Sequence, residues 1–166
     1  MRMHSIVALA TLIPCAAGAA QTVDTTWLAV DSTARTATLT LTAGLTSLNG
    51  GLNFNGFKSG DLTLVVPLGW TIVVNFDNKD QALPHSVVVV PASATLPPVP
   101  GAPAYPGAAT HHLTDGLPPG HSESIRFTAD HAGYFFLYCG VPGHGVVGMY
   151  VKLNVWRSAR TAYLKT

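Results

Sequence analysis

The residues of this chain best suited to chemistry are one cysteine, two histidines and one methionine. Three of them share a Gly- and Pro-rich stretch of eleven residues, from Cys139 through His144 to Met149, and His85 lies more than fifty residues upstream. They offer one thiolate, two imidazoles and one thioether, the ligand set of a mononuclear electron-transfer copper site. We therefore expect one copper ion per chain, cycling between Cu(I) and Cu(II), bound by His85, Cys139, His144 and Met149.

Each of these residues also has an ordinary structural interpretation. A lone cysteine is usually a small buried hydrophobe, and a lone methionine usually fills a gap in a core. If residues 1–20 are removed, however, Cys139 and Met149 are the only cysteine and methionine left, and both lie in the same short stretch. Zinc also accepts Cys and His ligands, but a thioether is a poor zinc ligand. The combination therefore favours copper.

The N-terminal residues resemble an export signal. A short positive segment at Met1–His4 precedes the mostly apolar segment Ser5–Ile13, and small residues follow at 16–20. We expect residues 1–20 to be a signal peptide and residues 21–166 to form a single domain, located in the periplasm or on the outer face of the cytoplasmic membrane. An uncleaved segment that acts as a membrane anchor is the alternative.

The composition excludes several kinds of partner. Only 10% of the residues are charged, and the formal net charge is +1, so no basic face is available for nucleic acid. The length left after export suits one domain and is too short for two. We expect a monomer.

The mature region is dominated by patterns typical of strands. Thr36–Thr42 alternates threonine with apolar residues, which is the period-two pattern of a strand with one buried face. His85–Val90 is a continuous apolar run that predicts a central strand covered on both faces. Further strands are expected at Leu62–Val66, Thr71–Phe76, Ser122–Phe127, Tyr134–Cys139 and Met149–Trp156. Turn residues stand at Asn49–Gly51 and at Asp77–Asp80. An all-β sandwich of about seven or eight strands follows.

One long Pro-, Ala- and Gly-rich loop interrupts this pattern at residues 91–120. Loops of this length are uncommon in compact domains and are often functional when they occur. Four histidines lie in or near the loop, and none has ligand spacing to a second metal. They are His111, His112, His121 and His131. We expect them on the surface, with adventitious metal binding or partner contact by the adjacent pair as the weaker alternative.

The predicted strands give the ligand spacing a geometric reason. Phe135, Leu137 and Cys139 share one face of their strand, so the cysteine sulfur should point inward at the edge of the core. Ser86 follows the first histidine and is expected to link the two ligand segments by hydrogen bonds. Asn53 could brace the ligand loops in the same way, or could satisfy the backbone of a turn, and the same holds for Asn55.

Several segments together resemble a known family, the cupredoxins, and within it most closely the sulfocyanins, with rusticyanin the nearest alternative. The segments are Leu52–Gly56, Val66–Trp70, Pro84–Ser86 and Tyr138–Tyr150. The resemblance implies a Greek-key β-sandwich with three strong trigonal ligands and one weak axial ligand. The trigonal ligands would be His85, Cys139 and His144, and the axial ligand Met149.

The resemblance also implies a function. Cupredoxins of this kind carry single electrons between respiratory redox proteins, such as cytochromes or a terminal oxidase, outside the cytoplasmic membrane. Apolar residues around His144, among them Val146 and Val147, would suit transient docking. We expect no enzymatic activity, because the additional paired histidine motifs of oxygen-reducing copper clusters are absent from the sequence. A copper carrier without a redox role is the alternative function.

Overall fold

The computed structural model describes residues 22–166, so the predicted signal peptide of residues 1–20 lies outside the described residues. The described part contains nine strands and two short 3-10 helices. The helices are η1 (Thr25–Trp27) and η2 (Leu48–Gly51). The strands are β1 (Leu28–Asp31), β2 (Thr36–Ala43), β3 (Thr63–Pro67), β4 (Thr71–Asn78), β5 (Val88–Pro91), β6 (Ser122–Thr128), β7 (Gly133–Tyr138), β8 (Tyr150–Trp156) and β9 (Tyr163–Lys165).

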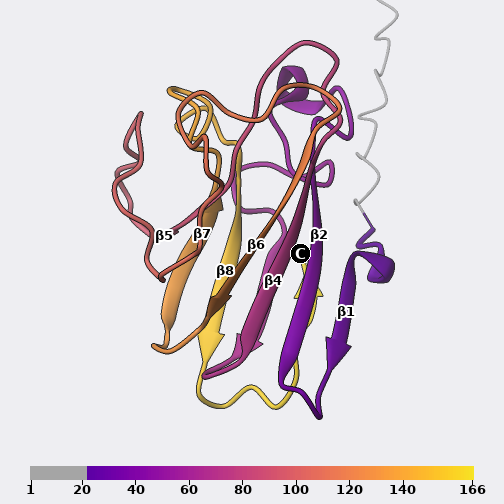
Figure 1. Cartoon of the computed structure of the whole chain (residues 1–166), viewed down its shortest axis with the longest axis vertical. Coiled ribbons are helices and arrows are strands. Elements are labelled where there is room, and N and C mark those ends of the chain that lie inside the picture. Colours follow the sequence, from indigo (N-terminus) through magenta and orange to yellow (C-terminus); the bar gives the residue numbers. More distant parts are fainter. Residues whose placement is uncertain (1–21) are drawn as a thin grey trace, which may run out of the picture.

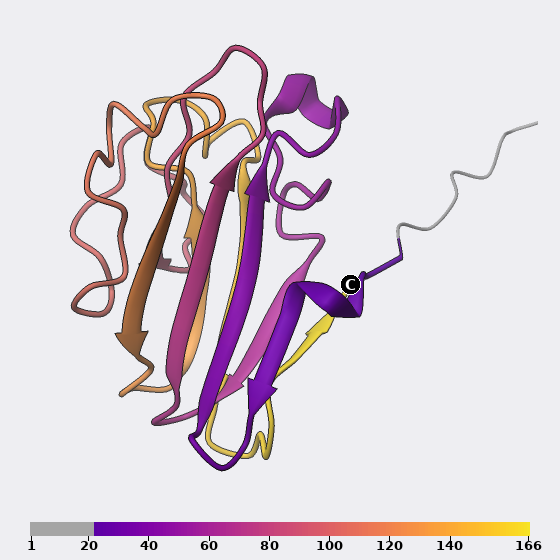
Figure 2. The same ribbon diagram turned by 45° about the vertical axis from the view of Figure 1, so that its right-hand side comes forward.

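The strands form two sheets that pack face to face (Figures 1 and 2). One sheet has the order β1-β2-β4-β6, and the other has the order β5-β7-β8-β3-β9. Strand β3 lies between β2 and β4 in the sequence but belongs to the opposite sheet, so the chain crosses the sandwich and returns. This crossing makes β2 and β4 parallel neighbours and pairs β3 with β8 in parallel. The predicted all-β sandwich is confirmed.

The core lies between the two sheets and is built from alternate residues of each strand. In β2, Ala37, Leu39 and Leu41 are each at most 1% exposed, and the threonines between them are half-buried. In β4, Ile72 and Val74 are fully buried on the same inner face. Each such aliphatic side chain contributes about 1.5–3 kcal/mol when it is removed from water. The alternation seen in the sequence therefore fixes which face of each strand points inward.

The sequence predicted a strand at His85–Val90 in the centre of its sheet. That position within the sheet is wrong. Strand β5 begins only at Val88 and is an edge strand, paired with β7 alone. Its three valines are nevertheless buried, because the 91–120 loop folds back along the free edge. The N–H of Val89 donates to the carbonyl of Ala108 at 2.9 Å, and the N–H of Ala104 donates to the carbonyl of Val89 at 2.8 Å. A loop can thus cover an edge strand, and the resulting burial resembles that of a central strand.

The first and last strands, β1 and β9, were not predicted. Strand β1 is largely exposed, and β9 pairs only with β3. Strand β1 has only four residues and β9 only three, so neither is long enough to show an alternating pattern.

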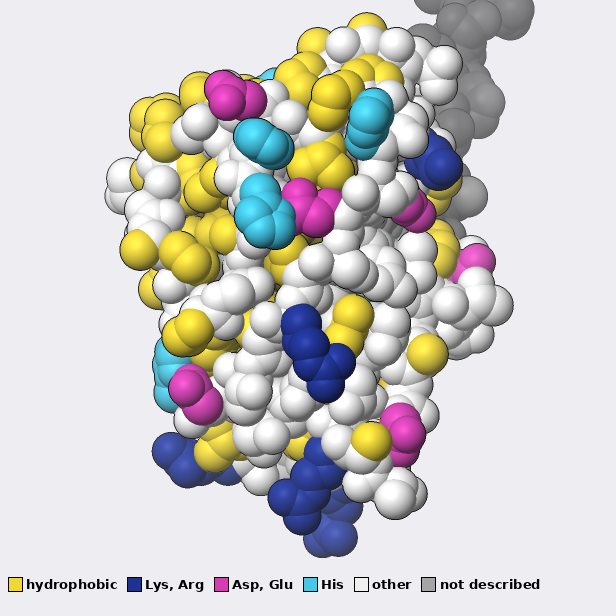
Figure 3. Space-filling view, in the orientation of Figure 1, with side chains coloured by type: hydrophobic (Ala, Val, Ile, Leu, Met, Phe, Trp, Pro, Cys, Tyr) yellow, Lys and Arg dark blue, Asp and Glu magenta, His cyan; other side chains and the backbone are white. Residues whose placement is uncertain are grey.

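The loops that carry or adjoin the predicted metal ligands meet at the end of the sandwich that lies uppermost in Figures 1 and 2. These loops are the segment after β2 that includes η2, the segment between β4 and β5, and the segment between β7 and β8. On the face shown in Figure 3, lysine and arginine lie mainly toward the opposite end, whereas most of the visible histidines lie in the upper half. Within residues 22–166, no helix has the length and apolar character needed to cross a membrane.

Candidate metal centre

The position of Cys139 follows from strand β7. Phe135 and Leu137 point into the core from this strand and are 4% and 0% exposed. Cys139 is the first residue after the strand and keeps the same inward direction, with no exposed surface. The predicted shared face of these three residues is confirmed. The thiol therefore lies at the end of the core, where the strand gives way to the loop.

The loop that follows returns the chain to Cys139 by a series of tight backbone turns. The N–H of His144 donates to the carbonyl of Val141, and the N–H of Met149 donates to the carbonyl of His144, both at 3.1 Å. The N–H of Cys139 in turn donates to the carbonyl of Met149 at 3.1 Å. Backbone hydrogen bonds thus join Cys139, His144 and Met149 to one another. Met149 is fully buried in the same core cluster as Cys139.

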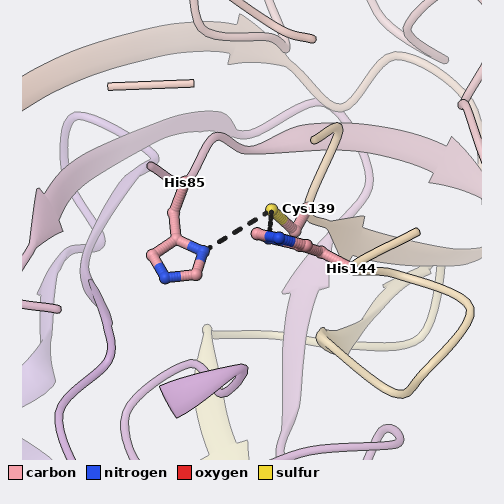
Figure 4. A group of neighbouring side chains, drawn as sticks. All are labelled: His85, Cys139 and His144. Carbon is pink, nitrogen blue, oxygen red and sulfur yellow. Dashed lines mark hydrogen bonds between the residues drawn. The ribbon is translucent and has the colours of Figure 1, made fainter. Parts of the chain in front are cut away.

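The donor atoms of three residues converge at this point (Figure 4). The Sγ of Cys139 lies 4.0 Å from the Nδ1 of His85 and 3.6 Å from the Nδ1 of His144. All three donor atoms lie within 4.8 Å of one another. His85 and Cys139 are completely buried, whereas His144 is half-buried. A thiol and two imidazole nitrogens that converge in this way fit a single thiophilic metal ion.

Burial controls the protonation of these groups. Burial raises the pKa of the Cys139 thiol, so its thiolate form needs a compensating cation. Burial also lowers the pKa of His85, opposed by its contact with Asp80, and lowers the pKa of His144. Neutral imidazoles keep a lone pair for a metal, and a bound metal ion replaces the thiol proton.

Ser86 has the linking role predicted for it. Its hydroxyl donates to the carbonyl of Leu113 at 2.7 Å and accepts the N–H of Gly140 at 2.9 Å. Because Ser86 follows His85 and Gly140 follows Cys139, this hydroxyl joins the two ligand segments.

For Asn53, the turn-backbone alternative is the one observed, whereas Asn55 bonds neither a ligand loop nor a turn but the backbone of a strand. Asn53 donates to the carbonyls of Thr46 and Leu48, within its own segment. Asn55 accepts the N–H of Thr42 and donates to the carbonyl of Thr40, on strand β2.

Two residues that the sequence marked only as turn residues also contact the site. Asn49 donates through Nδ2 to the carbonyl of Leu52 at 2.9 Å and to the carbonyl of Val147 in the ligand loop at 3.0 Å. The carboxylate of Asp80 lies 3.1 Å from the Nε2 of His85. The residue types around Asn49 and Asp80 predicted that both lie in turns. They did not predict which groups the two side chains contact.

The remaining histidines of residues 22–166 are on the surface, as predicted. The adjacent pair and the two that follow are all exposed, namely His111, His112, His121 and His131. Two of them pair with a single carboxylate each, His111 with Glu123 and His131 with Asp130. Within residues 22–166, the group around Cys139 is the one cluster of three or more such ligands.

A two-sheet β-sandwich that brings one buried cysteine and two histidines together at its end has the architecture of a cupredoxin, the class of blue copper electron-transfer proteins. The sulfocyanin (SoxE) domain family model matches residues 24–166, so the chain belongs to the sulfocyanin family. It is similar to a sulfocyanin from Sulfolobus acidocaldarius, with 32% identity over 139 residues, which cover 80% of this chain and 69% of the relative.

Solved cupredoxin structures resemble the chain as well. Dithionite-reduced auracyanin from Roseiflexus castenholzii is 28% identical with a TM-score of 0.50, and the match covers 72% of this chain and 96% of auracyanin. Rusticyanin from Thiobacillus ferrooxidans is 23% identical with a TM-score of 0.55, and the match covers 79% of this chain and 88% of rusticyanin. The predicted cupredoxin fold and the predicted copper cofactor are confirmed by family and fold.

Proposed function

We propose that the chain binds one copper ion through His85, Cys139 and His144, with Met149 as the weak axial ligand, and carries single electrons between respiratory redox proteins. The observation that carries this proposal is the convergence of two imidazole Nδ1 atoms on one buried thiol. Bound copper supplies a one-electron couple between Cu(I) and Cu(II).

The protein supplies a rigid frame for that couple. Cys139 is held by the end of β7, His144 and Met149 by the backbone bonds of their loop, and His85 by the segment before β5. The hydroxyl of Ser86 fixes the spacing between the two segments. Ligands held in this way cannot rearrange freely when the oxidation state of the metal changes. The reorganisation energy of electron transfer therefore stays small.

The exposure of the site favours a carrier over an enzyme. His85 and Cys139 have no exposed surface, so the proposed centre offers no open side to a substrate. His144 is the one strong ligand with exposed surface, and we assign it as the contact through which electrons enter and leave. Val146 and Val147, beside it in the same loop, are 39% and 54% exposed. Small apolar contacts of this kind suit partners that must also separate.

The proposed location is outside the cytoplasmic membrane, in the periplasm or on the membrane's outer face. This proposal is supported by the export pattern in residues 1–20. The proposed partners are cytochromes or a terminal oxidase, which exchange one electron at a time, and the proposed association is transient. The whole-chain net charge of +1 supports docking through apolar contacts.

Voltammetry of the copper-loaded protein tests the proposal. We expect a reversible wave of one electron per chain, and we expect Met149→Leu to move the midpoint potential upward while keeping the wave reversible, because the thioether donor is removed. Loss of copper on reduction, or the absence of a reversible wave, would exclude an electron carrier.

A further inference from the structure

The carboxylate of Asp80 lies directly behind the buried histidine of the centre. Its Oδ2 is 3.1 Å from the Nε2 of His85, and its side chain is only 10% exposed. The other ring nitrogen, Nδ1, faces the Sγ of Cys139 at 4.0 Å. The imidazole of His85 therefore stands between a carboxylate and the thiol of the metal centre.

This carboxylate is fixed in place by its own hydrogen bonds. Its Oδ1 accepts the N–H groups of Ala82 and Leu83 at 2.9 and 3.0 Å. The N–H of Asp80 donates to the Oδ1 of Asn78 at 3.0 Å. Both backbone N–H groups donate to the same oxygen, Oδ1, so the carboxylate acts here as a hydrogen-bond acceptor and leaves Oδ2 to face His85.

Two glycines leave room for the carboxylate. A Cβ on Gly44 would lie 2.7 Å from the Cα of Asp80, and a Cβ on Gly51 would overlap Oδ2. Both glycines have positive φ values, 66° and 91°. The segment between β2 and β3 closes over Asp80 because these two positions lack side chains.

We propose that Asp80 is a positioning residue of the copper centre. By accepting the Nε2–H of His85, it holds this ring in the tautomer whose lone pair is on Nδ1, on the side of Cys139. Its negative charge behind the ring also favours the more positive oxidation state of a bound metal. The inference rests on the proposed function, because it requires His85 to be a copper ligand.

Replacement of Asp80 by asparagine keeps the shape of the side chain but removes its charge and exchanges one oxygen acceptor for an NH₂ donor. An asparagine has one oxygen, and two backbone N–H groups compete with His85 for it. With the oxygen kept by Ala82 and Leu83, the amide NH₂ points at the Nε2 of His85. A donor at that place favours the Nδ1–H tautomer, in which the proton occupies the position needed by the metal.

The first experiment is ¹⁵N NMR of the histidine rings in the metal-free full chain. We expect the Nε2–H tautomer for His85 in the native protein and the Nδ1–H tautomer in Asp80→Asn. Cu(II) affinity should fall about 10- to 100-fold in Asp80→Asn, and the midpoint potential of the copper that still binds should move upward.

Asp31→Asn is the matched control. It removes the same charge from an exposed residue at the end of β1, which pairs with the end of β2 remote from Gly44. Asp31 accepts one backbone N–H, from Ala34 at 2.8 Å, and asparagine can keep this bond. In this variant the tautomer of His85, the affinity for Cu(II) and the midpoint potential of the bound copper should all match those of the native protein.

Two results would overturn the proposal. One is an Nδ1–H tautomer of His85 in the native protein, which decides the matter even if Asp80→Asn fails to fold. The other is a folded Asp80→Asn protein with native affinity and native potential. If the native protein itself shows no thiolate-to-copper absorption, it is the proposed function that fails, so the two failures are distinguishable.

Discussion

The hydroxyl of Ser86 accepts the N–H of Gly140 at 2.9 Å and thereby joins the residue after His85 to the residue after Cys139. The same hydroxyl donates to the carbonyl of Leu113 in the 91–120 loop at 2.7 Å. One small side chain thus fixes the distance between two ligand segments that are far apart in the sequence, and attaches the long loop to both.

Removal of this hydroxyl should destabilise the protein. In Ser86→Ala, the buried N–H of Gly140 loses its partner, which costs about 1–3 kcal/mol. Urea unfolding followed by circular dichroism measures the loss. Ser93→Ala is the control, since Ser93 lies exposed in the same long loop and accepts one bond from Thr95. Equal stability of the two variants would show that the Ser86 link contributes nothing.

The ligand loop should not tolerate a side chain at position 145. A Cβ on Gly145 would overlap the ring of Tyr138, which is fully buried and held by a hydrogen bond of 2.6 Å from its hydroxyl to the carbonyl of Pro97. We expect Gly145→Ala to lower the free energy of unfolding by about 1–3 kcal/mol and to shift the copper absorption, because His144 is adjacent.

The control for this variant is Gly101→Ala, where an added Cβ meets nothing within 4 Å. Its stability and its spectrum should match those of the native protein. A Gly145→Ala protein that is indistinguishable from this control would refute the close packing of the loop on Tyr138.

A charge on the proposed docking surface should slow electron exchange. Val146→Lys places a cation beside His144, and two copies that meet through this surface then repel each other. We expect the rate of electron self-exchange between Cu(I) and Cu(II) protein, measured by NMR line broadening, to fall about tenfold or more, equivalent to about 1.4 kcal/mol in the barrier. The absorption spectrum should be unchanged.

Val30→Lys is matched to this variant in exposure, since both valines are 39% exposed, and it lies on β1. It should exchange electrons at the native rate. If both lysine variants exchange equally fast, electrons do not pass through the surface around Val146.

The sequence predicted the parts of the site that depend on short-range spacing. Cys139 and His144 share a loop, so their residue types and separation were sufficient to propose a shared metal. Ser86 was predicted because it adjoins a ligand. The strand faces also followed from alternation, because the core of a sandwich selects every second residue.

Contacts that depend on the meeting of distant loops could not be predicted in this way. Asp80 had the pattern of a turn residue, and its contact with His85 exists only because Gly44 and Gly51 let another segment close over it. The edge position of β5 was missed for a similar reason. Its burial comes from the 91–120 loop, and an apolar run gives no information on whether a strand or a loop covers it.

The most direct test of the account is the optical and electron paramagnetic resonance spectrum of the protein with one equivalent of Cu(II), compared with that of Cys139→Ser. We expect an intense visible thiolate-to-copper band, with a narrow copper hyperfine splitting, in the native protein, and loss of the band in the variant. A colourless native protein, or a band that survives in Cys139→Ser, would contradict it.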